Sequence, residues 1–367
     1  MTTQKPSRTT HPYHMHDAIL GQPKAIARVL DSQQEAVHNL GERLVKAKRV
    51  YIVGIGTSWH ASLVGEYLLR TVADREEAQA WNSFEFCAHP PPLNDEALVI
   101  VMSHRGSKQV SAQALALSKK RGAVTAVVTG QDSAAREDLA DSVIRTCPQE
   151  KSAAFTISHT TAMTALMMLA AEVGATAGQP EAKELSKSLQ KLPQWVEETL
   201  DVEPQVRRVA QRYRDEKWFH FLGWGPNIAT AYEAALKMKE ANYTVTEGFQ
   251  IEYYLHGPFV ATGPGFLVTL IAPPGAGEKR AKDIAKAAKE IGAKVLAIAQ
   301  KEDAGLSSIA DDLLAMPPVQ EPLSPIIYLV PLQLFTYWLA VELGCNPDTF
   351  RWDNPRYHAA RQHYLPI

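Results

Sequence analysis

The stretch VYIVGIGTSWHASLVGEYLLR, residues 50–70, joins a continuous apolar run to a glycine turn and a helical pattern. The apolar run at 50–56 carries no charge and ends in two glycines, which is typical of a strand buried on both faces of a parallel sheet. Thr57 and Ser58 stand where the N-cap of a helix is expected, before the helical pattern of residues 59–70. The stretch therefore predicts a buried strand, a tight turn and a helix.

The same alternation continues along the chain. Residues 97–106, ALVIVMSHRG, are predicted to form a strand and a turn, residues 107–122 a helix, and residues 123–129, AVTAVVT, the next strand. Strands and helices that alternate in this way indicate an α/β fold with a parallel sheet and right-handed crossovers.

A repeat relates the two halves of the sequence. Gly54 recurs as Gly223, and Gly106 recurs as Gly275 at the same offset, since 223 − 54 = 275 − 106. Self-similarity at a fixed period indicates a duplicated structural unit, so we predict two copies of one α/β domain. The predicted segments are a disordered arm at 1–14, a helical segment at 15–48, the first domain at 49–175, a helical connection at 176–215, the second domain at 216–348 and a C-terminal tail at 349–367.

Composition limits the class of protein. Hydrophobic residues make up 46% of the 367 residues, which is enough for substantial cores. The 38 basic and 40 acidic residues nearly cancel, so nucleic acid is not an expected partner. The three cysteines are widely spaced, which fits a reduced, cytoplasmic setting.

Neither a secretory signal nor a membrane span is predicted. The N-terminus is polar and has no apolar core of the kind that a signal peptide needs. The longest apolar run, residues 326–341, is interrupted by Pro331 and Gln333 and falls short of about 20 clean apolar residues. We therefore expect it to form a strand end and a helix in the core.

Metal and nucleotide sites are not predicted either. His11, His14 and His16 fall in the predicted arm, where they are expected to be solvated. The glycine turns lack the GxGxxG spacing of a dinucleotide fold. We expect no metal ion and no cofactor.

Glu233, Lys237 and Glu240 are spaced at i, i+4 and i+7, so they share one face of a predicted helix. Two interpretations are open. The three side chains form either an exposed, salt-bridged surface or an inward-facing group for moving protons. His256, in the turn His-Gly-Pro, is either a structural histidine or a second proton carrier, because its unperturbed pKa is close to neutral pH.

Several motifs in order resemble those of the sugar isomerase (SIS) family, and in particular the isomerase half of glucosamine-6-phosphate synthase. GIGTSWHA at 54–61 resembles that enzyme's CGTSYHA, and YEAALKMKEANY at 232–243 resembles EGALKLKEISY. LHGP at 255–258 resembles KHGP, and residues 325–348 resemble the closing helix. The resemblance runs from about residue 15 to the C-terminus. It implies two tandem SIS domains, each a parallel sheet between helices in a flavodoxin-like, three-layer α/β/α arrangement.

The resemblance also implies a phosphate site, with an altered second loop. The loop at 103–108, SHRGSK, takes the place of the family's SQSGET, so only two of its residues match. The alternatives are that the hydroxyls at 57–58 only cap a helix and that the basic residues are solvated. The expected phosphate-binding residues are Thr57, Ser58, Ser103, Arg105, Ser107 and Lys108. The expected pocket residues are Gly56, His104, Thr156 and Glu233.

The catalytic roles that the resemblance implies fall on three residues. Glu240 matches the base that moves a proton between C1 and C2 of the open-chain sugar, and His256 matches the histidine that opens the ring, typically across a dimer interface. Lys237 is expected to hold a carboxylate or to neutralise enediolate charge. The family's imine-forming lysine in the tail over the active site falls on Ala360, so a lysine imine is not expected.

These features predict a cytoplasmic, homodimeric enzyme whose partner is a small sugar phosphate. The expected reaction is aldose–ketose isomerisation and/or deamination (deglycation) of a hexose or amino-hexose phosphate. The alternative is a sensor that binds sugar phosphate without catalysis. Because no cysteine precedes Cys87, no glutaminase activity is expected in this chain.

Overall fold

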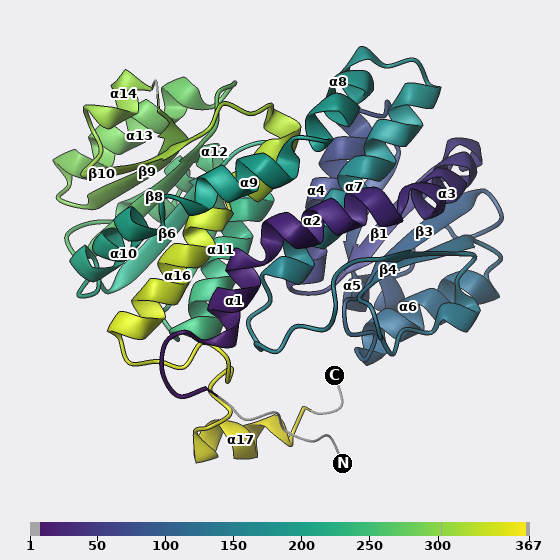
Figure 1. The fold of residues 1–367 in the computed structure, drawn as a ribbon, viewed down its shortest axis with the longest axis horizontal. Helices are drawn as coiled ribbons and strands as arrows, with labels where there is room; N and C mark the ends of the chain where they lie inside the picture. Colours follow the sequence, from purple (N-terminus) through teal and green to yellow (C-terminus); the bar gives the residue numbers. More distant parts are fainter. Residues whose placement is uncertain (1–7, 302, 365–367) are drawn as a thin grey trace. The chain divides into compact units, whose positions relative to one another are not determined.

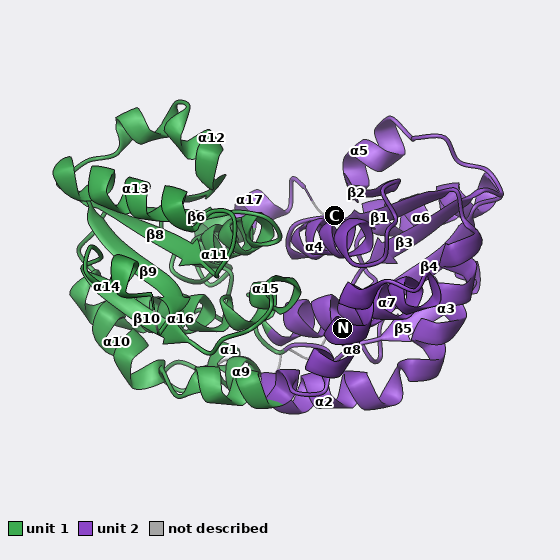
Figure 2. Cartoon of the chain, turned by 90° about the horizontal axis from the view of Figure 1, so that it is seen from above, with its two compact units in different colours: residues 1–20, 151–156, 194–358 green, residues 21–150, 157–193, 359–367 purple. Residues whose placement is uncertain are grey.

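The computed structural model describes residues 8–301 and 303–364. The chain divides into two compact units, which are drawn in different colours in Figure 2. Unit 1 takes the described residues of 1–20, 151–156 and 194–358, and unit 2 takes those of 21–150, 157–193 and 359–367. Both units are therefore discontinuous in sequence, in contrast to the consecutive segments that the sequence predicted.

Unit 2 holds one five-stranded sheet in the order β2-β1-β3-β4-β5, with every neighbouring pair parallel. Its elements are labelled in Figure 1. They are α2 (Gln22–Ser32), α3 (Gln34–Lys46), β1 (Arg49–Gly54), α4 (Thr57–Thr71), β2 (Ala78–Asn82), α5 (Ser83–Ala88), β3 (Ala97–Met102), α6 (Gln109–Lys120), β4 (Val124–Thr129), η1 (Glu137–Leu139), β5 (Ser142–Arg145), α7 (Ile157–Thr176) and α8 (Pro180–Leu189).

Both faces of this sheet are buried. Because side chains alternate along a strand, Tyr51 and Val53 of β1 pack with Phe86 of α5 on one face. The residue between them, Ile52, lies on the other face, against α4. Helices α5 and α6 contact each other on the first face, and α4 and α7 contact each other on the second. Unit 2 is the predicted three-layer α/β/α domain.

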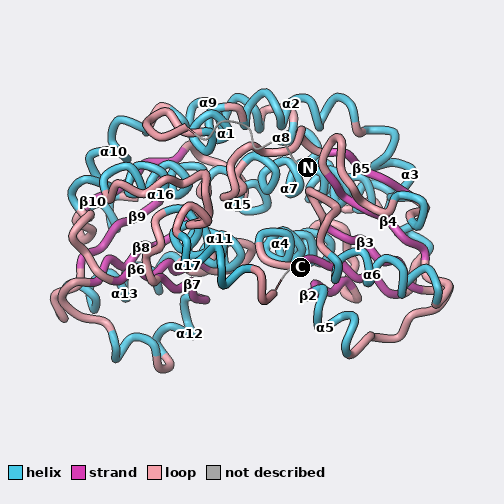
Figure 3. Tube along the Cα trace, turned by 90° about the horizontal axis from the view of Figure 1, so that it is seen from below, coloured by secondary structure: helices cyan, strands magenta, loops and turns pink. Residues whose placement is uncertain are grey.

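Unit 1 holds a second sheet of five parallel strands in the order β10-β9-β8-β6-β7. In Figure 3 its strands lie between helices, as in unit 2. The elements are α1 (His14–Leu20), α9 (Leu192–Leu200), α10 (Glu203–Arg212), β6 (Trp218–Gly223), α11 (Asn227–Ala241), β7 (Thr246–Gln250), α12 (Ile251–Leu255), η2 (Pro258–Ala261), β8 (Phe266–Ala272), α13 (Glu278–Glu290), β9 (Lys294–Gln300), α14 (Ala304–Ser307), β10 (Asp312–Met316), η3 (Glu321–Leu323), α15 (Ser324–Ile327), α16 (Val330–Glu342) and α17 (Pro355–Arg361), whose last residues belong to unit 2.

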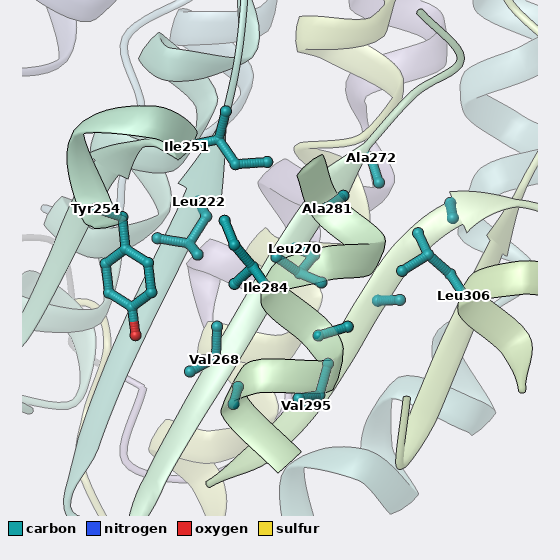
Figure 4. Close-up of a cluster of buried hydrophobic side chains, with 14 of the residues drawn as sticks. Leu222, Ile251, Tyr254, Val268, Leu270, Ala272, Ala281, Ile284, Val295 and Leu306 are labelled. Carbon is teal, nitrogen blue, oxygen red and sulfur yellow. The ribbon is translucent and has the colours of Figure 1, made fainter. Parts of the chain in front are cut away.

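A buried apolar cluster fixes one face of the second sheet. Leu222 of β6 and Leu270 of β8 meet Ile284 of α13 and Tyr254 of α12, and all four side chains are fully buried. Figure 4 shows this cluster, which reaches Leu306 of α14 at its far end. Burial of apolar side chains of this size stabilises a fold by about 1.5–3 kcal/mol each.

The two sheets confirm the predicted repeat. The offset that takes Gly54 to Gly223 also takes strand β1 to β6. The two sheets have the same strand order, because β2-β1-β3-β4-β5 in the first corresponds to β7-β6-β8-β9-β10 in the second. The turn after the first strand needs glycine in both copies. A Cβ on Gly54 would lie 2.4 Å from the carbonyl oxygen of Ser58, and one on Gly223 would lie 2.2 Å from that of Asn227.

The longest apolar run lies in the core as predicted, but it contains no strand. Residues 326–341 form the end of α15, a two-residue turn and most of α16, so the predicted strand end is wrong, because tertiary burial decides between helix and strand for an apolar run. The surrounding stretch Glu321–Glu342 is long and apolar enough to cross a membrane, yet 94% of its most apolar window is buried inside the protein. A helix in the core of a folded protein can be this long and apolar, and it is expected to be buried to this extent.

The predicted disordered arm at 1–14 falls partly on residues 1–7, which lie outside the described residues. Residues 8–14 differ from the prediction. Tyr13 is buried, and its N–H donates to the Tyr337 hydroxyl at 3.2 Å. His11 Nδ1 lies 2.6 Å from the same hydroxyl, and His16 Nε2 lies 2.6 Å from Glu203 Oε1. Side chains of α16 and α10 supply these contacts, and a local sequence pattern does not reveal them. Within 8–301 and 303–364, no group of three or more His, Cys, Asp or Glu side chains is placed to hold a metal ion.

Candidate functional site

In unit 1 the three charged residues of α11 form one buried cluster. Lys237 Nζ lies 3.3 Å from Glu233 Oε1 and pairs with Glu240 Oε2. The side chains of Glu233 and Lys237 are 0% and 1% exposed, and that of Glu240 is 12% exposed. The surface salt-bridge interpretation is therefore wrong, because the shared helix face points into the protein.

This cluster holds two carboxylates against one ammonium. Taking three charged groups out of water costs several kcal/mol per ion, and hydrocarbon side chains of similar volume often fill such a position at no loss of stability. A buried, charged triad is thus costly as a structural device. Its partly exposed member, Glu240, is the carboxylate that a ligand can reach.

His256 lies apart from this cluster in its contacts. It is the C-cap residue of α12, its side chain is 72% exposed, and its Nε2 lies 3.3 Å from Glu252 Oε1. Glu252 also pairs with Arg280, whose Nε lies 2.7 Å from Oε2. The exposed imidazole is available to an approaching molecule, but no contact between His256 and the α11 cluster is seen within the described residues.

In unit 2 three of the predicted phosphate-binding residues, Thr57, Ser58 and Lys108, lie at or near the start of α4. Gly56 is the N-cap residue of this helix, with Thr57 and Ser58 in its first turn. Lys108 Nζ lies 3.9 Å from the position that a Cβ would take at Gly56. The end of the second loop thus reaches the N-terminus of α4, where helix N–H groups and the helix dipole favour an anion.

The loop at 103–108 is held rigidly by its backbone. Ser103 is buried and its N–H donates to the carbonyl of Val128 at 3.0 Å. Gly106 has φ of +68°, and a Cβ there would lie 2.0 Å from the Ala135 nitrogen, so glycine is required at this position. The Arg105 carbonyl accepts from the Ala134 N–H at 3.1 Å. Ser107 is exposed beside these packed residues.

His104 is packed rather than solvated within this loop. A Cβ added to Gly130 would lie only 2.7 Å from the His104 ring. The His104 carbonyl accepts a hydrogen bond from Gln149 Nε2 at 3.0 Å. Burial, with a smaller contribution from the charge of Arg105, lowers the pKa of His104 to about 4. The ring is therefore neutral at pH 7.

Arg105 carries its charge next to two other charged residues of unit 2. Its guanidinium is partly desolvated although the residue as a whole is exposed, and this desolvation lowers its pKa. Glu150 acts in the opposite direction, and the charge of Arg361 lowers the pKa further. The sequence did not single out Glu150 for a role, but its buried carboxylate accepts the Ser158 N–H at 2.8 Å and so caps α7.

The remaining predicted pocket residue, Thr156, is fully buried and belongs to unit 1. It ends the short segment 151–156, whose backbone is held by Asp348. The Ala153 N–H donates to the Asp348 carbonyl at 3.2 Å, and Ser152 Oγ donates to the Pro347 carbonyl at 3.4 Å. Ala360, the position without the lysine, is exposed in α17.

Comparison with known proteins agrees with this architecture. The SIS domain family model matches residues 43–172 and 213–343. The glutamine–fructose-6-phosphate aminotransferase (isomerizing) of Thermococcus kodakarensis is 33% identical over 355 residues, which cover 95% of this chain and 58% of that protein. The enzyme of the same name from Pyrococcus horikoshii is 30% identical over 353 residues, with the same coverage of both chains. The chain thus spans little more than half the length of these relatives.

Three solved structures share the fold. The C-terminal domain of glucosamine-fructose-6-phosphate aminotransferase from Francisella tularensis has a TM-score of 0.83 at 19% identity, covering 92% of this chain and 98% of that chain. A glucosamine-6-phosphate deaminase from Thermotoga maritima has a TM-score of 0.73 at 23% identity, covering 92% and 97%. A tagatose-6-phosphate ketose/aldose isomerase from Escherichia coli has a TM-score of 0.77 at 18% identity, covering 95% and 98%. With two matched segments and two sheets of the same order, this chain belongs to the SIS domain family.

Proposed function

We propose that the protein is a phosphosugar enzyme that moves a proton between C1 and C2 of a hexose or amino-hexose phosphate. The reaction is aldose–ketose isomerisation and/or deamination (deglycation). The observation that carries this proposal is the buried Glu233–Lys237–Glu240 cluster, in which Glu240 alone is partly exposed. The relatives support the substrate class, because their names are those of isomerases, deaminases and aminotransferases of hexose 6-phosphates.

The chemistry assigned to Glu240 is that of a general base. Its carboxylate takes the proton from one carbon of the open-chain sugar and returns it to the neighbouring carbon, a role that supplies about 10²–10⁴ in rate. The ammonium of Lys237 pairs with this carboxylate and offsets negative charge on the enediolate. Glu233 holds Lys237 from its other side, 3.3 Å away.

The loops after β1 and β3 supply the phosphate site in this proposal. Thr57, Ser58 and Ser103 provide hydroxyls, the first turn of α4 provides backbone N–H groups, and Lys108 adds a positive charge at the N-terminus of this helix. Arg105 and Ser107 extend the same loop. His256 is assigned the opening of the sugar ring, and its exposure is compatible with a homodimer in which it serves a second copy. We place the enzyme in the cytoplasm.

The test is NMR in D₂O with fructose 6-phosphate, glucosamine 6-phosphate and fructosamine 6-phosphates as separate substrates. We expect exchange at C1 or C2, with ammonia or amine released from the substrates that carry nitrogen. The variant Glu240→Gln should lose at least about 100-fold in exchange rate. Glu247→Gln, which changes an exposed carboxylate on β7, is the matched control and should keep the wild-type rate.

A sensor that binds sugar phosphate without catalysis is the alternative. The altered loop at 103–108 and the alanine at position 360 favour it, since both depart from the pattern of catalytic relatives. Tight binding with no exchange, together with no effect of Glu240→Gln on binding, would establish the sensor and reject the enzyme.

A further inference from the structure

Backbone strain is concentrated at one place in unit 1. Among the described residues, five that are not glycine have positive φ, and three of these five lie in two segments that contact each other through Arg351. They are Tyr243, Phe350 and Arg351, with φ of 63°, 55° and 61°. Such a conformation is strained for a residue other than glycine and persists only where surrounding contacts hold it. Strain of this kind, gathered from two distant parts of the chain, calls for a functional explanation.

The contacts that hold these residues centre on Tyr243. Its hydroxyl accepts from the Arg351 N–H at 3.1 Å and lies 3.4 Å from Thr349 Oγ1. It also donates to the Asn346 carbonyl at 3.5 Å. The Arg351 guanidinium carbon lies 4.8 Å from the centre of the Tyr243 ring and 4.1 Å from that of Tyr357. The cation is thus stacked on two aromatic rings, an attraction that grows stronger when the groups are desolvated.

Tyr243 follows directly on the helix that carries the proposed base. Helix α11 ends at Ala241, and its C-cap residue Asn242 donates its N–H to the Met238 carbonyl at 3.1 Å. Asn242 Nδ2 also donates to the Thr336 carbonyl of α16 at 3.4 Å. Glu240 lies in the last turn of α11, so the backbone that fixes its position leads straight into Tyr243.

The other side of the same contacts reaches the segment 151–156. We call residues 346–351 the joint. Within it, the Asp348 carbonyl accepts a hydrogen bond from the Ala153 N–H. The two carboxylate oxygens of Asp348 also accept the N–H groups of His14 and Met15 at 2.8 and 2.9 Å. The joint therefore connects the C-terminal end of α11, the pocket segment with Thr156 and the start of α1 within one unit.

We propose that this joint is a positioning device for Glu240, with Tyr243 and Arg351 as its positioning residues. The inference rests on the proposed function. The joint sets the last turn of α11 relative to the segment 151–156, so that the carboxylate of Glu240 lies in line for proton transfer. Misplacing a catalytic group by about 1 Å can cost 100-fold in rate. A structural staple of the same strength lowers stability but leaves turnover unchanged.

The experiment compares Tyr243→Phe with the matched control Tyr357→Phe. The first variant keeps the ring but removes the hydroxyl that bonds to Arg351 and the joint, while the second keeps the ring on which Arg351 stacks. We expect Tyr243→Phe to lower kcat for proton exchange by about 10- to 100-fold with KM within about twofold of wild type. Arg351→Met should act in the same direction, and Arg351→Lys, which keeps a cation over the rings, should recover part of the rate.

Three outcomes overturn the inference. An unchanged kcat in Tyr243→Phe makes the joint a structural staple, as does a loss of kcat that merely follows the fraction unfolded. An equal loss in Tyr357→Phe removes the special role of the Tyr243 hydroxyl.

Failure of the proposed function is distinguishable from failure of the joint. If the wild-type protein exchanges no substrate proton, the proposed function fails, and the joint is then measured by amide hydrogen exchange. Tyr243→Phe should raise exchange roughly tenfold both at residues 240–243 and at residues 152–156, because the joint couples them. Faster exchange at 240–243 alone would reject the coupling.

Discussion

The two copies of the α/β unit have the same strand order but put different side chains at matching positions. The offset of the repeat takes Glu233 to Val64 and Lys237 to Leu68, since 233 − 64 and 237 − 68 both equal 223 − 54. All four side chains are buried. The first copy thus fills with hydrocarbon the positions that the second copy fills with charge. The fold does not require these charges, which supports the catalytic role proposed for the cluster in the second copy.

The loops after the third strand of the two sheets differ in the opposite sense. In the first copy, the loop at 103–108 brings Lys108 toward the N-terminus of a helix. In the second copy, the Gly275 N–H donates to Glu278 Oε1 at 2.8 Å. In the second copy, the Glu278 carboxylate of α13 therefore takes the position at the helix N-terminus that a bound anion would have. The comparison supports the proposal that the first copy holds the phosphate and the second copy carries the base.

The largest expected effect comes from removing the cation of the second copy. Lys237→Leu places the hydrocarbon of the first copy beside two carboxylates and should lose about 3–5 kcal/mol of unfolding free energy. The triple variant Glu233→Val, Lys237→Leu, Glu240→Thr copies Val64, Leu68 and Thr71 and should be at least as stable as wild type. Urea unfolding measures both. A triple variant less stable than Lys237→Leu would show that the charges are structural.

The next effect concerns the anion. Lys108→Ala should weaken binding of inorganic phosphate and of fructose 6-phosphate by about 10- to 100-fold, because it removes a charge-assisted contact. Glu278→Gln, the matched change in the second copy, should leave both affinities unchanged. Isothermal titration calorimetry provides the measurement. Equal losses in the two variants would break the assignment of the phosphate to the first copy.

The smallest effects come from a contact that both copies retain. Asp141 pairs with Lys119 at 2.5 Å and accepts the Thr125 N–H at 2.9 Å. One position beyond the offset of the repeat, Asp311 pairs with Lys289 and accepts the Val295 N–H at 2.8 Å. Asp141→Asn and Asp311→Asn should each cost about 1 kcal/mol at neutral pH. The loss should be larger for Asp311, whose side chain is 12% exposed against 27% for Asp141.

The same contact sets a pH dependence. For both carboxylates, burial raises the pKa, but the lysine partner and the backbone N–H outweigh it and the net pKa is lowered. A lowered folded pKa means that the stabilisation is present above the unfolded value near 3.9 and is lost as the pH falls through the folded value. The difference between wild type and each Asn variant should therefore shrink on acidification, as measured by urea unfolding at about pH 7 and about pH 3. A constant difference would contradict the charged contact.

Much of the fold follows from local pattern. The run at 50–56 predicted β1, observed at Arg49–Gly54, and the glycine spacing predicted the repeat because a tight turn after the first strand admits no Cβ in either copy. What pattern did not reveal depends on distant partners. The shared face of Glu233, Lys237 and Glu240 was predictable from helical spacing, but its burial was not. Periodicity does not say whether a charged face of a helix points to solvent or to the core.

The functional site shows the same division. Gly56, Thr57 and Ser58 were predicted at a helix N-terminus and lie there, because a strand–turn–helix unit is local. The joint at 346–351 and its partner Tyr243 gave no local signal. Their contacts join positions that are far apart in the sequence, and three of these residues take a backbone conformation that their residue types rarely adopt.

The discontinuity of unit 1 has a consequence for the order of folding. The N–H groups that begin α1 find their partner in Asp348, close to the other end of the chain from His14. During synthesis α1 therefore cannot form these hydrogen bonds until almost the whole chain has been made, whereas the strands of unit 2 pair within residues 49–145. We expect unit 2 to fold first and the start of α1 to remain a ready target for proteases or chaperones until residue 348 has emerged from the ribosome.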